Sequence, residues 1–102
     1  MIFQFDNRSY EILVQETVTV STTAIGFTVA NLTNSTDVVV RINDQDLRFR
    51  TDGTDPTAAS GWTAEPGDLY VITTTEEAAA FKAIRTGGTD SEIDVMYLRR
   101  TP

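Results

Sequence analysis

Residues 38–50 read VVVRINDQDLRFR, and this stretch decides the fold class. Val38, Val40 and Ile42 are separated by single residues, and the same two-residue period continues in the LRFR of residues 47–50. A period of two places alternate side chains on opposite faces of an extended chain. The polar NDQD between the two runs is a turn signal. The stretch therefore predicts two strands separated by a turn, each with one face directed inward.

The same period recurs along the chain, and turn signals interrupt it about every ten residues. The further candidate strands are Phe3 to Phe5, Tyr10 to Val14, Val18 to Val20, Tyr70 to Ile72, and Ile93 to Leu98. Threonine is the most frequent residue, and its branched Cβ favours extended backbone. Short strands at this spacing predict an all-β fold, either an antiparallel β-sandwich or a jelly-roll-like barrel.

One segment fits two structures. Residues 75–85 read TEEAAAFKAIR, with a candidate N-cap at Thr75, acids in the first turn and good helix formers after them. Phe81, Ala83 and Arg85 also alternate with Lys82 and Ile84, as in a strand. We favour a short helical turn followed by a strand. The fold then contains at most one short helix, near residues 76–84.

The length of 102 residues is that of one domain, so residues 1–102 are expected to form a single β-sandwich. Residues 36–102 would form its core, and residues 1–35 would be either an arm that crosses to a neighbouring subunit or an added pair of strands. A core of this size gives marginal stability, which favours support from other subunits.

The chain has no cysteine and no histidine, which removes disulfides, thiolate nucleophiles, Cys/His zinc sites and the commonest near-neutral general base. Fifteen acidic residues against eight basic ones give a formal charge of -7, which opposes binding to nucleic acids and to anionic membranes. No apolar run approaches a membrane span, and the N-terminus carries charge where a signal peptide is apolar. We expect a protein made in a cytoplasm, with no cofactor.

The run RFRTDGTDPT at residues 48–57 concentrates arginine and aspartate around a turn. Arg48 and Arg50 lie two apart on a predicted strand and so share a face, about 7 Å from each other. They could clamp an anion, but pairing with nearby acids is the interpretation we favour. Asp52-Gly53 is a turn dipeptide, and the spacing of its acids does not match a calcium loop. We expect no metal here.

Two chemical interpretations use side chains around this run. Trp62 and Tyr70 could stack on a sugar ring, with polar contacts from Arg50, Asp52 and Asp55. A hydrolase would need two carboxylates, and the candidates for such a pair are Asp52, Asp55, Glu65 and Asp68. The hydrolase is the least favoured interpretation because any acidic chain supplies such pairs. We expect no enzymatic activity.

Four segments occur in an order that resembles a known group of proteins: RFRTDGTDPTAASGW, EPGDLYVI, AAAFKAIRTGG and IDVMYLRR. Small structural proteins encoded among the head and tail genes of tailed bacteriophages and prophages have a similar order of elements. Here these elements fall on Arg48 to Thr57, Gly61, Pro66 to Asp68, Phe81 to Arg85, and Val95 to Arg99. The resemblance covers residues 38–99.

The resemblance implies a virion component of β-sandwich or jelly-roll-like fold that packs against copies of itself or against a capsid lattice, without catalysis. A head decoration or cement protein is the most concrete expectation, and a neck or tail subunit is the next. The partners would be further copies of the chain, a trimer among the options, and major capsid or neck and tail proteins. The candidate interface residues are Phe3, Phe5, Ile25, Phe27, Arg48, Arg50, Asp52 and Trp62. The alternative is a carbohydrate-binding β-module associated with a tail or fibre.

Overall fold

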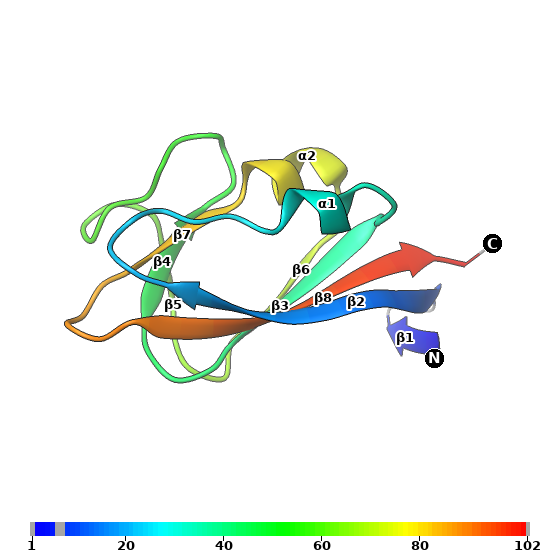
Figure 1. Ribbon diagram of the computed structural model, residues 1–102, viewed down its shortest axis with the longest axis horizontal. Coiled ribbons are helices and arrows are strands. Elements are labelled where there is room, and N and C mark those ends of the chain that lie inside the picture. Colours follow the sequence, from blue (N-terminus) through cyan, green and yellow to red (C-terminus); the bar gives the residue numbers. More distant parts are fainter. Residues whose placement is uncertain (1, 6–7, 102) are drawn as a thin grey trace.

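The chain folds into two antiparallel sheets packed face to face, in a computed structural model that describes residues 2–5 and 8–101, with side chains from residue 9 (Figure 1). The larger sheet contains, in spatial order, β1 (Ile2–Phe5), β2 (Arg8–Val20), β8 (Ser91–Arg100), β3 (Asp37–Ile42) and β6 (Leu69–Ile72). The smaller sheet contains β5 (Trp62–Ala64), β4 (Leu47–Arg50) and β7 (Lys82–Arg85). The prediction of an all-β sandwich is confirmed.

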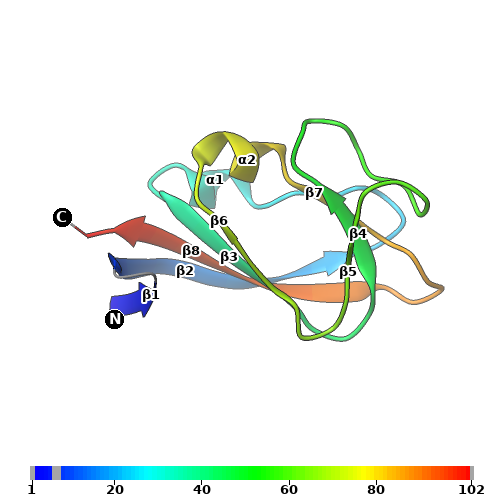
Figure 2. The same cartoon turned by 180° about the vertical axis from the view of Figure 1, so that it is seen from behind.

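The inner face of the larger sheet carries the main core. Its two central strands alternate as predicted, with Val38, Val40 and Ile42 of β3 level with Tyr97, Val95 and Ile93 of β8. The smaller sheet covers one end of this face through Leu47, Ala64 and Ala83. The two short helices, α1 (Val29–Leu32) and α2 (Thr75–Ala80), lie over the other end (Figures 1 and 2).

Residues 75–85 form a helical turn followed by a strand, as the sequence analysis favoured. Thr74 caps α2, because its Oγ1 accepts a hydrogen bond of 3.2 Å from the backbone N–H of Glu77, so the cap is one residue earlier than predicted. The helix ends at Ala80 because Phe81 is extended and its ring is buried in the core, which starts β7. The one-turn helix α1 is a second helix that the sequence analysis did not predict.

The N-terminal third contributes strands to the larger sheet. β2 pairs with β8 over most of its length, and β1 pairs with the first residues of β2 from Arg8 to Glu11. The side chains of Phe3 and Phe5, two candidate interface residues, lie outside the described part of the structure.

A β-bulge between Ile12 and Val14 divides β2 into two halves that serve different faces. Before the bulge, Tyr10 and Ile12 lie on the outer face, where Tyr10 forms a second apolar cluster with Val39 and Leu98. After it, Val18 and Val20 lie on the inner face and join the main core. The alternation of Tyr10, Ile12 and Val14 in the sequence therefore does not mark a single face.

The segment after β2 crosses to the smaller sheet and is fixed there by close backbone packing at Gly26. Ile25 forms a two-way bridge to Ala83, with N···O distances of 3.0 and 2.8 Å. A Cβ added at Gly26 would lie 2.7 Å from the carbonyl oxygen of Phe81, which is closer than two such atoms approach. The close approach of the two backbones therefore requires glycine at this position.

Replacing Gly26 with alanine should lower the free energy of unfolding by about 1 to 2 kcal/mol, because the backbone must move to admit the methyl group. Gly88→Ala is the matched control: a Cβ there meets nothing within 4 Å, so it should change stability by less than about 0.5 kcal/mol. Urea denaturation of both variants measures the difference. Equal stabilities would contradict the close packing at Gly26.

Candidate functional site

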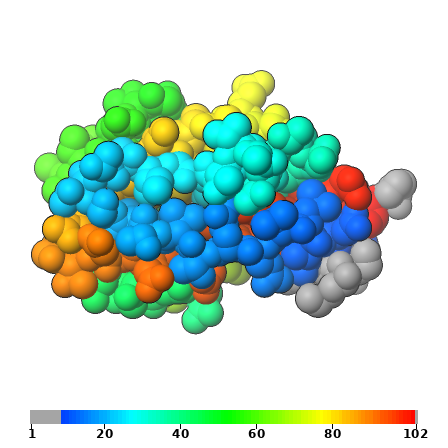
Figure 3. Space-filling view, viewed as in Figure 1, coloured from blue at the N-terminus to red at the C-terminus, as the bar shows by residue number. Residues whose placement is uncertain are grey.

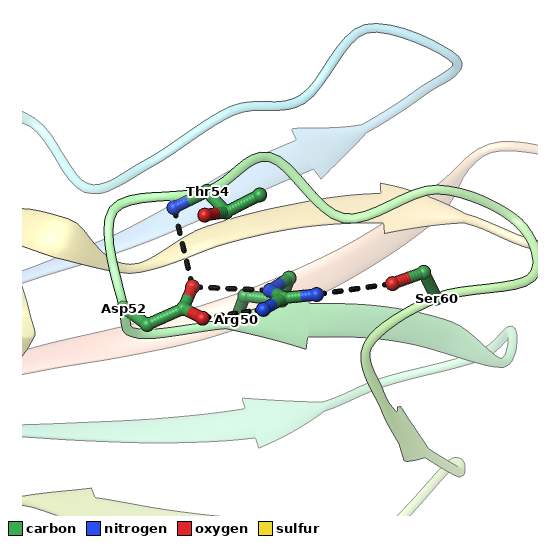
Figure 4. A network of polar contacts seen from close by, with 4 residues as sticks. All are labelled: Arg50, Asp52, Thr54 and Ser60. Atoms are coloured by element: carbon green, nitrogen blue, oxygen red, sulfur yellow. Dashed lines mark hydrogen bonds and ion pairs between the residues drawn. The ribbon is translucent and has the colours of Figure 1, made fainter.

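The two arginines of the RFRTDGTDPT run are bound by their own chain, and Figure 4 shows the contacts of Arg50. Arg50 donates from Nε to Asp52 Oδ1 at 3.0 Å and from a terminal nitrogen to Ser60 Oγ at 3.0 Å, and it forms a second, ion-paired contact to Asp52. Asp52 also accepts from the backbone N–H of Thr54 at 3.2 Å. Arg48 donates to the carbonyl oxygen of Gly61 at 2.9 Å. These bonds fasten both ends of the loop 51–61 to β4.

The electrostatics of this loop fit a fastened turn. The hydrogen bonds from Arg50 and from the backbone of Thr54 lower the pKa of Asp52 to about 2. A carboxyl group that acts as a general acid needs a raised pKa, so the lowered pKa of Asp52 does not suit that role. Among the described residues, no cluster of three or more acidic side chains is arranged to hold a metal ion. The geometry of the loop is therefore that of a turn held in place by hydrogen bonds within the chain.

Trp62 begins β5 directly after this loop and is the most exposed aromatic side chain of the described residues, at 66%. Tyr70 of β6 lies close to Trp62, and its hydroxyl donates to Asp68 at 3.2 Å. The Tyr70 ring is half-buried and packs edge-on against Phe49, with centroids 5.0 Å apart. Burial, together with the charge of Asp68, raises the pKa of Tyr70. The Trp62 side chain is thus accessible to a partner, whereas the Tyr70 ring packs mainly against core residues.

Trp62 of β5 and Leu69 and Val71 of β6 are exposed apolar side chains at the edge of the sandwich where these two strands lie. Leu69 is 60% exposed and Val71 is 42% exposed, and both lie on the outer face of β6. The view from behind brings these two strands to the front (Figure 2). Trp62 lies opposite Phe49 and so on the inner side, where Tyr70 packs, so the exposed apolar side chains occupy both sides of this edge. Exposed apolar side chains grouped at one edge mark an interaction surface more often than scattered ones do. Sequence analysis identified Trp62 here and missed Leu69 and Val71.

A partly buried polar network joins β2, β8, α1 and the segment before α1. Glu16 accepts hydrogen bonds from Thr28 Oγ1 at 2.9 Å, from Asn31 Nδ2 at 3.0 Å and from the Tyr97 hydroxyl. The Tyr97 hydroxyl also accepts from the backbone N–H of Thr28 at 3.1 Å. Phe27 packs edge-on against the Tyr97 ring, with centroids 6.1 Å apart. This network holds the segment before α1 against the larger sheet.

The network shifts the pKa values of both its titratable groups. Burial opposes ionisation of Glu16, but the hydrogen bonds from Tyr97, Thr28 and Asn31 outweigh it and lower its pKa. Burial, together with the hydrogen bond to Glu16, raises the pKa of Tyr97 to about 12. Sequence analysis missed this pair. The available signal was Glu16 itself, an acid within the inward-facing series of Val14, Val18 and Val20.

A hollow of about 570 Å³ lies beside this network, between β2 and the segment that follows it. Thr17 and Thr19 of β2 form one wall, Ile25 and Val29 of the following segment form the other, and Lys82 also lines the hollow. Val29 is 79% exposed and Ile25 is 38% exposed. Figure 3 shows this face of the molecule, with β2 in blue below the cyan segment. The hollow is open to solvent and has mainly uncharged walls.

The candidate interface residues thus fall in different places. Arg48, Arg50 and Asp52 lie at the fastened corner, Trp62 lies beside the β6 edge, and Ile25 lies at the hollow. Phe27 is buried, with its ring stacked on Phe81 at 4.3 Å, although it contributes to the wall of the hollow.

Among the described residues, no helix is long and apolar enough to cross a membrane.

Comparison with known proteins adds no family assignment: no protein family matches the sequence, and no curated protein or solved structure shows significant similarity to the chain.

Proposed function

We propose that this protein is a non-enzymatic structural component of a tailed bacteriophage or prophage virion, most concretely a head decoration or cement protein. It acts by packing against copies of itself or against the capsid. The observation that carries the proposal is the apolar edge formed by Trp62, Leu69 and Val71 on a chain of strongly negative charge. A lattice supplies many such contacts at once, so that modest individual interfaces give firm attachment through effective concentration.

The proposed role also explains the use of the polar side chains. Arg48, Arg50 and Asp52 fasten a loop, and Glu16 and Tyr97 fasten the segment before α1. Their bonds rigidify the two ends of the sandwich, and a rigid surface loses less conformational entropy on association than a flexible one. This arrangement suits a component that works by fitting against its neighbours.

Mass spectrometry of purified virions tests the role. We expect peptides of this chain in density-purified particles of the phage that encodes it, at many copies per particle. Deletion of the gene should give particles that lose DNA or break more readily on heating, if the chain is a cement protein. Absence of the chain from intact particles would refute the proposal.

A carbohydrate-binding module is the second candidate, and the exposed indole of Trp62 favours it. It differs in its ligand: a glycan array should then give binding that Trp62→Ala removes. The fastened Arg50 and Asp52 would have to supply the polar contacts without leaving their present bonds.

A further inference from the structure

The larger sheet has an open edge at β6. In an antiparallel pair, successive residues direct their backbone groups alternately to the two sides of the strand. The backbone N–H of Ile42 on the β3 side donates to the carbonyl of Asp68, so the even-numbered residues of β6 face β3. Leu69 and Val71 therefore direct their N–H and C=O groups away from the sheet. β3 is the only strand paired with β6 among the described residues.

The other side of the sheet is open along the second half of β2. β1 pairs only with the first residues of β2, up to Glu11. Beyond the bulge, Glu16 and Val18 lie opposite Val95 and Ile93 of β8, and the backbone N–H of Asn43 on the far side of β8 donates to Glu92. Even-numbered residues of β8 thus face β3 and odd-numbered ones face β2. It follows that Gln15, Thr17 and Thr19 direct their backbone groups outward.

The open parts of both edges have little of the usual protection against pairing. Proteins block exposed strand edges with charged side chains, prolines or bulges. Residues 69–75 contain no charge and no proline. In residues 14–36 the one charge is that of Glu16, whose carboxylate is bonded to Thr28, Asn31 and Tyr97 of its own chain. In a chain with a formal charge of -7, these are surfaces at which two copies meet without like-charge repulsion.

We propose that copies of this chain join head to tail, with β6 of one copy adding antiparallel to the open half of β2 of the next. Strands alternate in direction across the sheet, so copies in the same orientation place β6 and β2 antiparallel at their junction. The outward groups of Leu69 and Val71 then bond those of Thr17 and Thr19, and one sheet continues through successive copies. The inference rests on the proposed function and names the contact that the packing uses.

The layer beneath the sheet supplies a second part of the contact. β5 lies beside β6 on the inner side, so Trp62 of one copy faces the hollow beside β2 of the next. Threonine, Ile25 and Val29 form walls against which an indole can pack. Lys82 also lines the hollow, and an ammonium group is attracted to the face of an indole ring. Head-to-tail pairing therefore covers both open edges, whereas a symmetric β6 to β6 dimer leaves β2 and the hollow exposed.

Two edge-blocked variants test the pairing by mixing. Proline is tolerated in an edge strand where its missing N–H faces solvent, so Thr19→Pro and Val71→Pro each block one edge and leave the pairs within the sheet intact. Wild-type chain should form multimers that close into a ring or extend as a filament. Each variant alone should have the mass of one chain in sedimentation velocity. The equimolar mixture should show a twofold rise in mass, because each variant keeps the edge that the other has lost.

Controls keep the result interpretable. Thr89→Pro, in the exposed turn before β8, should associate like the wild type. Thr19→Lys and Val71→Lys form a second pair that blocks the same edges by charge, and far-ultraviolet circular dichroism checks that every variant is folded. Trp62 is the only tryptophan, so its fluorescence emission should shift to shorter wavelength on association of the wild type and in the mixture.

The opposing outcomes are distinct. Dimers of Thr19→Pro alone would indicate symmetric β6 pairing and overturn the proposal, and so would a mixture that stays at the mass of one chain. A wild-type chain that remains single at high concentration would also overturn it. Detection of the chain in purified virions is a separate measurement. It decides the virion role, whereas the association of the variants decides the edge pairing, so failure of one can be told from failure of the other.

Discussion

Replacing Phe81 with alanine should lower the free energy of unfolding by about 3 to 5 kcal/mol, the largest effect that we expect from a single substitution. The Phe81 ring is buried and stacks on Phe27 at 4.3 Å and on Phe49 at 5.4 Å. It therefore joins the segment before α1, the smaller sheet and the start of β7. A small domain has only about 5 to 15 kcal/mol of stability in total, so this variant should be close to unfolding at physiological temperature.

Chemical denaturation at 25 °C measures this loss. Phe81→Leu is the control, since it keeps most of the buried volume and loses the aromatic stacking, and it should cost clearly less than the alanine variant. If Phe81→Ala were as stable as Phe81→Leu, the ring would not be a central part of the core.

Raising the pH from 10 to 12 should lower the free energy of unfolding of the wild type by about 2 kcal/mol through Tyr97 alone. The ordinary pKa of tyrosine is 10.0 and that of Tyr97 is about 12, so in this interval the unfolded chain has lost the phenol proton while the folded chain keeps it. Stability from a raised pKa is complete below the unfolded value and is lost as the pH rises through the folded value.

Comparison with Tyr97→Phe isolates this contribution from the other tyrosines. The variant should lose stability at neutral pH, because the backbone N–H of Thr28 and the carboxylate of Glu16 both lose a hydrogen-bond partner. Between pH 10 and 12 its stability should fall less steeply than that of the wild type. Parallel curves in denaturant titrations across this interval would contradict the raised pKa.

Lowering the pH should also reduce the free energy of unfolding, through Glu16 of the same network. Glu16 has a lowered pKa, so its contribution is present above the ordinary value of 4.5 and is lost as the pH falls through the folded value. The Glu16→Gln variant should lack this part of the acid dependence.

The fold class could be predicted because it follows from the two-residue period of apolar side chains within each strand. Val38 to Ile42 and Ile93 to Leu98 alternate cleanly, since one face of each strand packs in the core, and the turn and strand at residues 75–85 also follow from local preferences. The order of strands could not be predicted in this way. β2 lies beside β8 at the opposite end of the chain, and no local pattern encodes which distant strands pair.

The candidate sites were harder to predict, for a related reason. The choice of acid pairing over an anion clamp at Arg50 rested on charge proximity, and Arg50 does pair with Asp52 two residues away. Arg48 bonds a backbone carbonyl, for which the sequence has no marker. The network of Glu16, Thr28, Asn31 and Tyr97 draws on residues up to 81 positions apart, so it becomes visible only when the chain is folded.

The bulge in β2 has a consequence for how this gene can diverge. Before the bulge, the even-numbered apolar side chains of β2 point to the outer face and belong to the outer cluster. After the bulge, the even-numbered apolar side chains point to the inner face and belong to the main core. Substitutions along β2 can accumulate one at a time, but losing a single codon at position 13 would rotate one half of the strand by a full face. Related sequences should therefore vary mainly at the exposed positions of this strand while keeping its length, and an alignment gap between positions 12 and 14 should be absent among folded relatives.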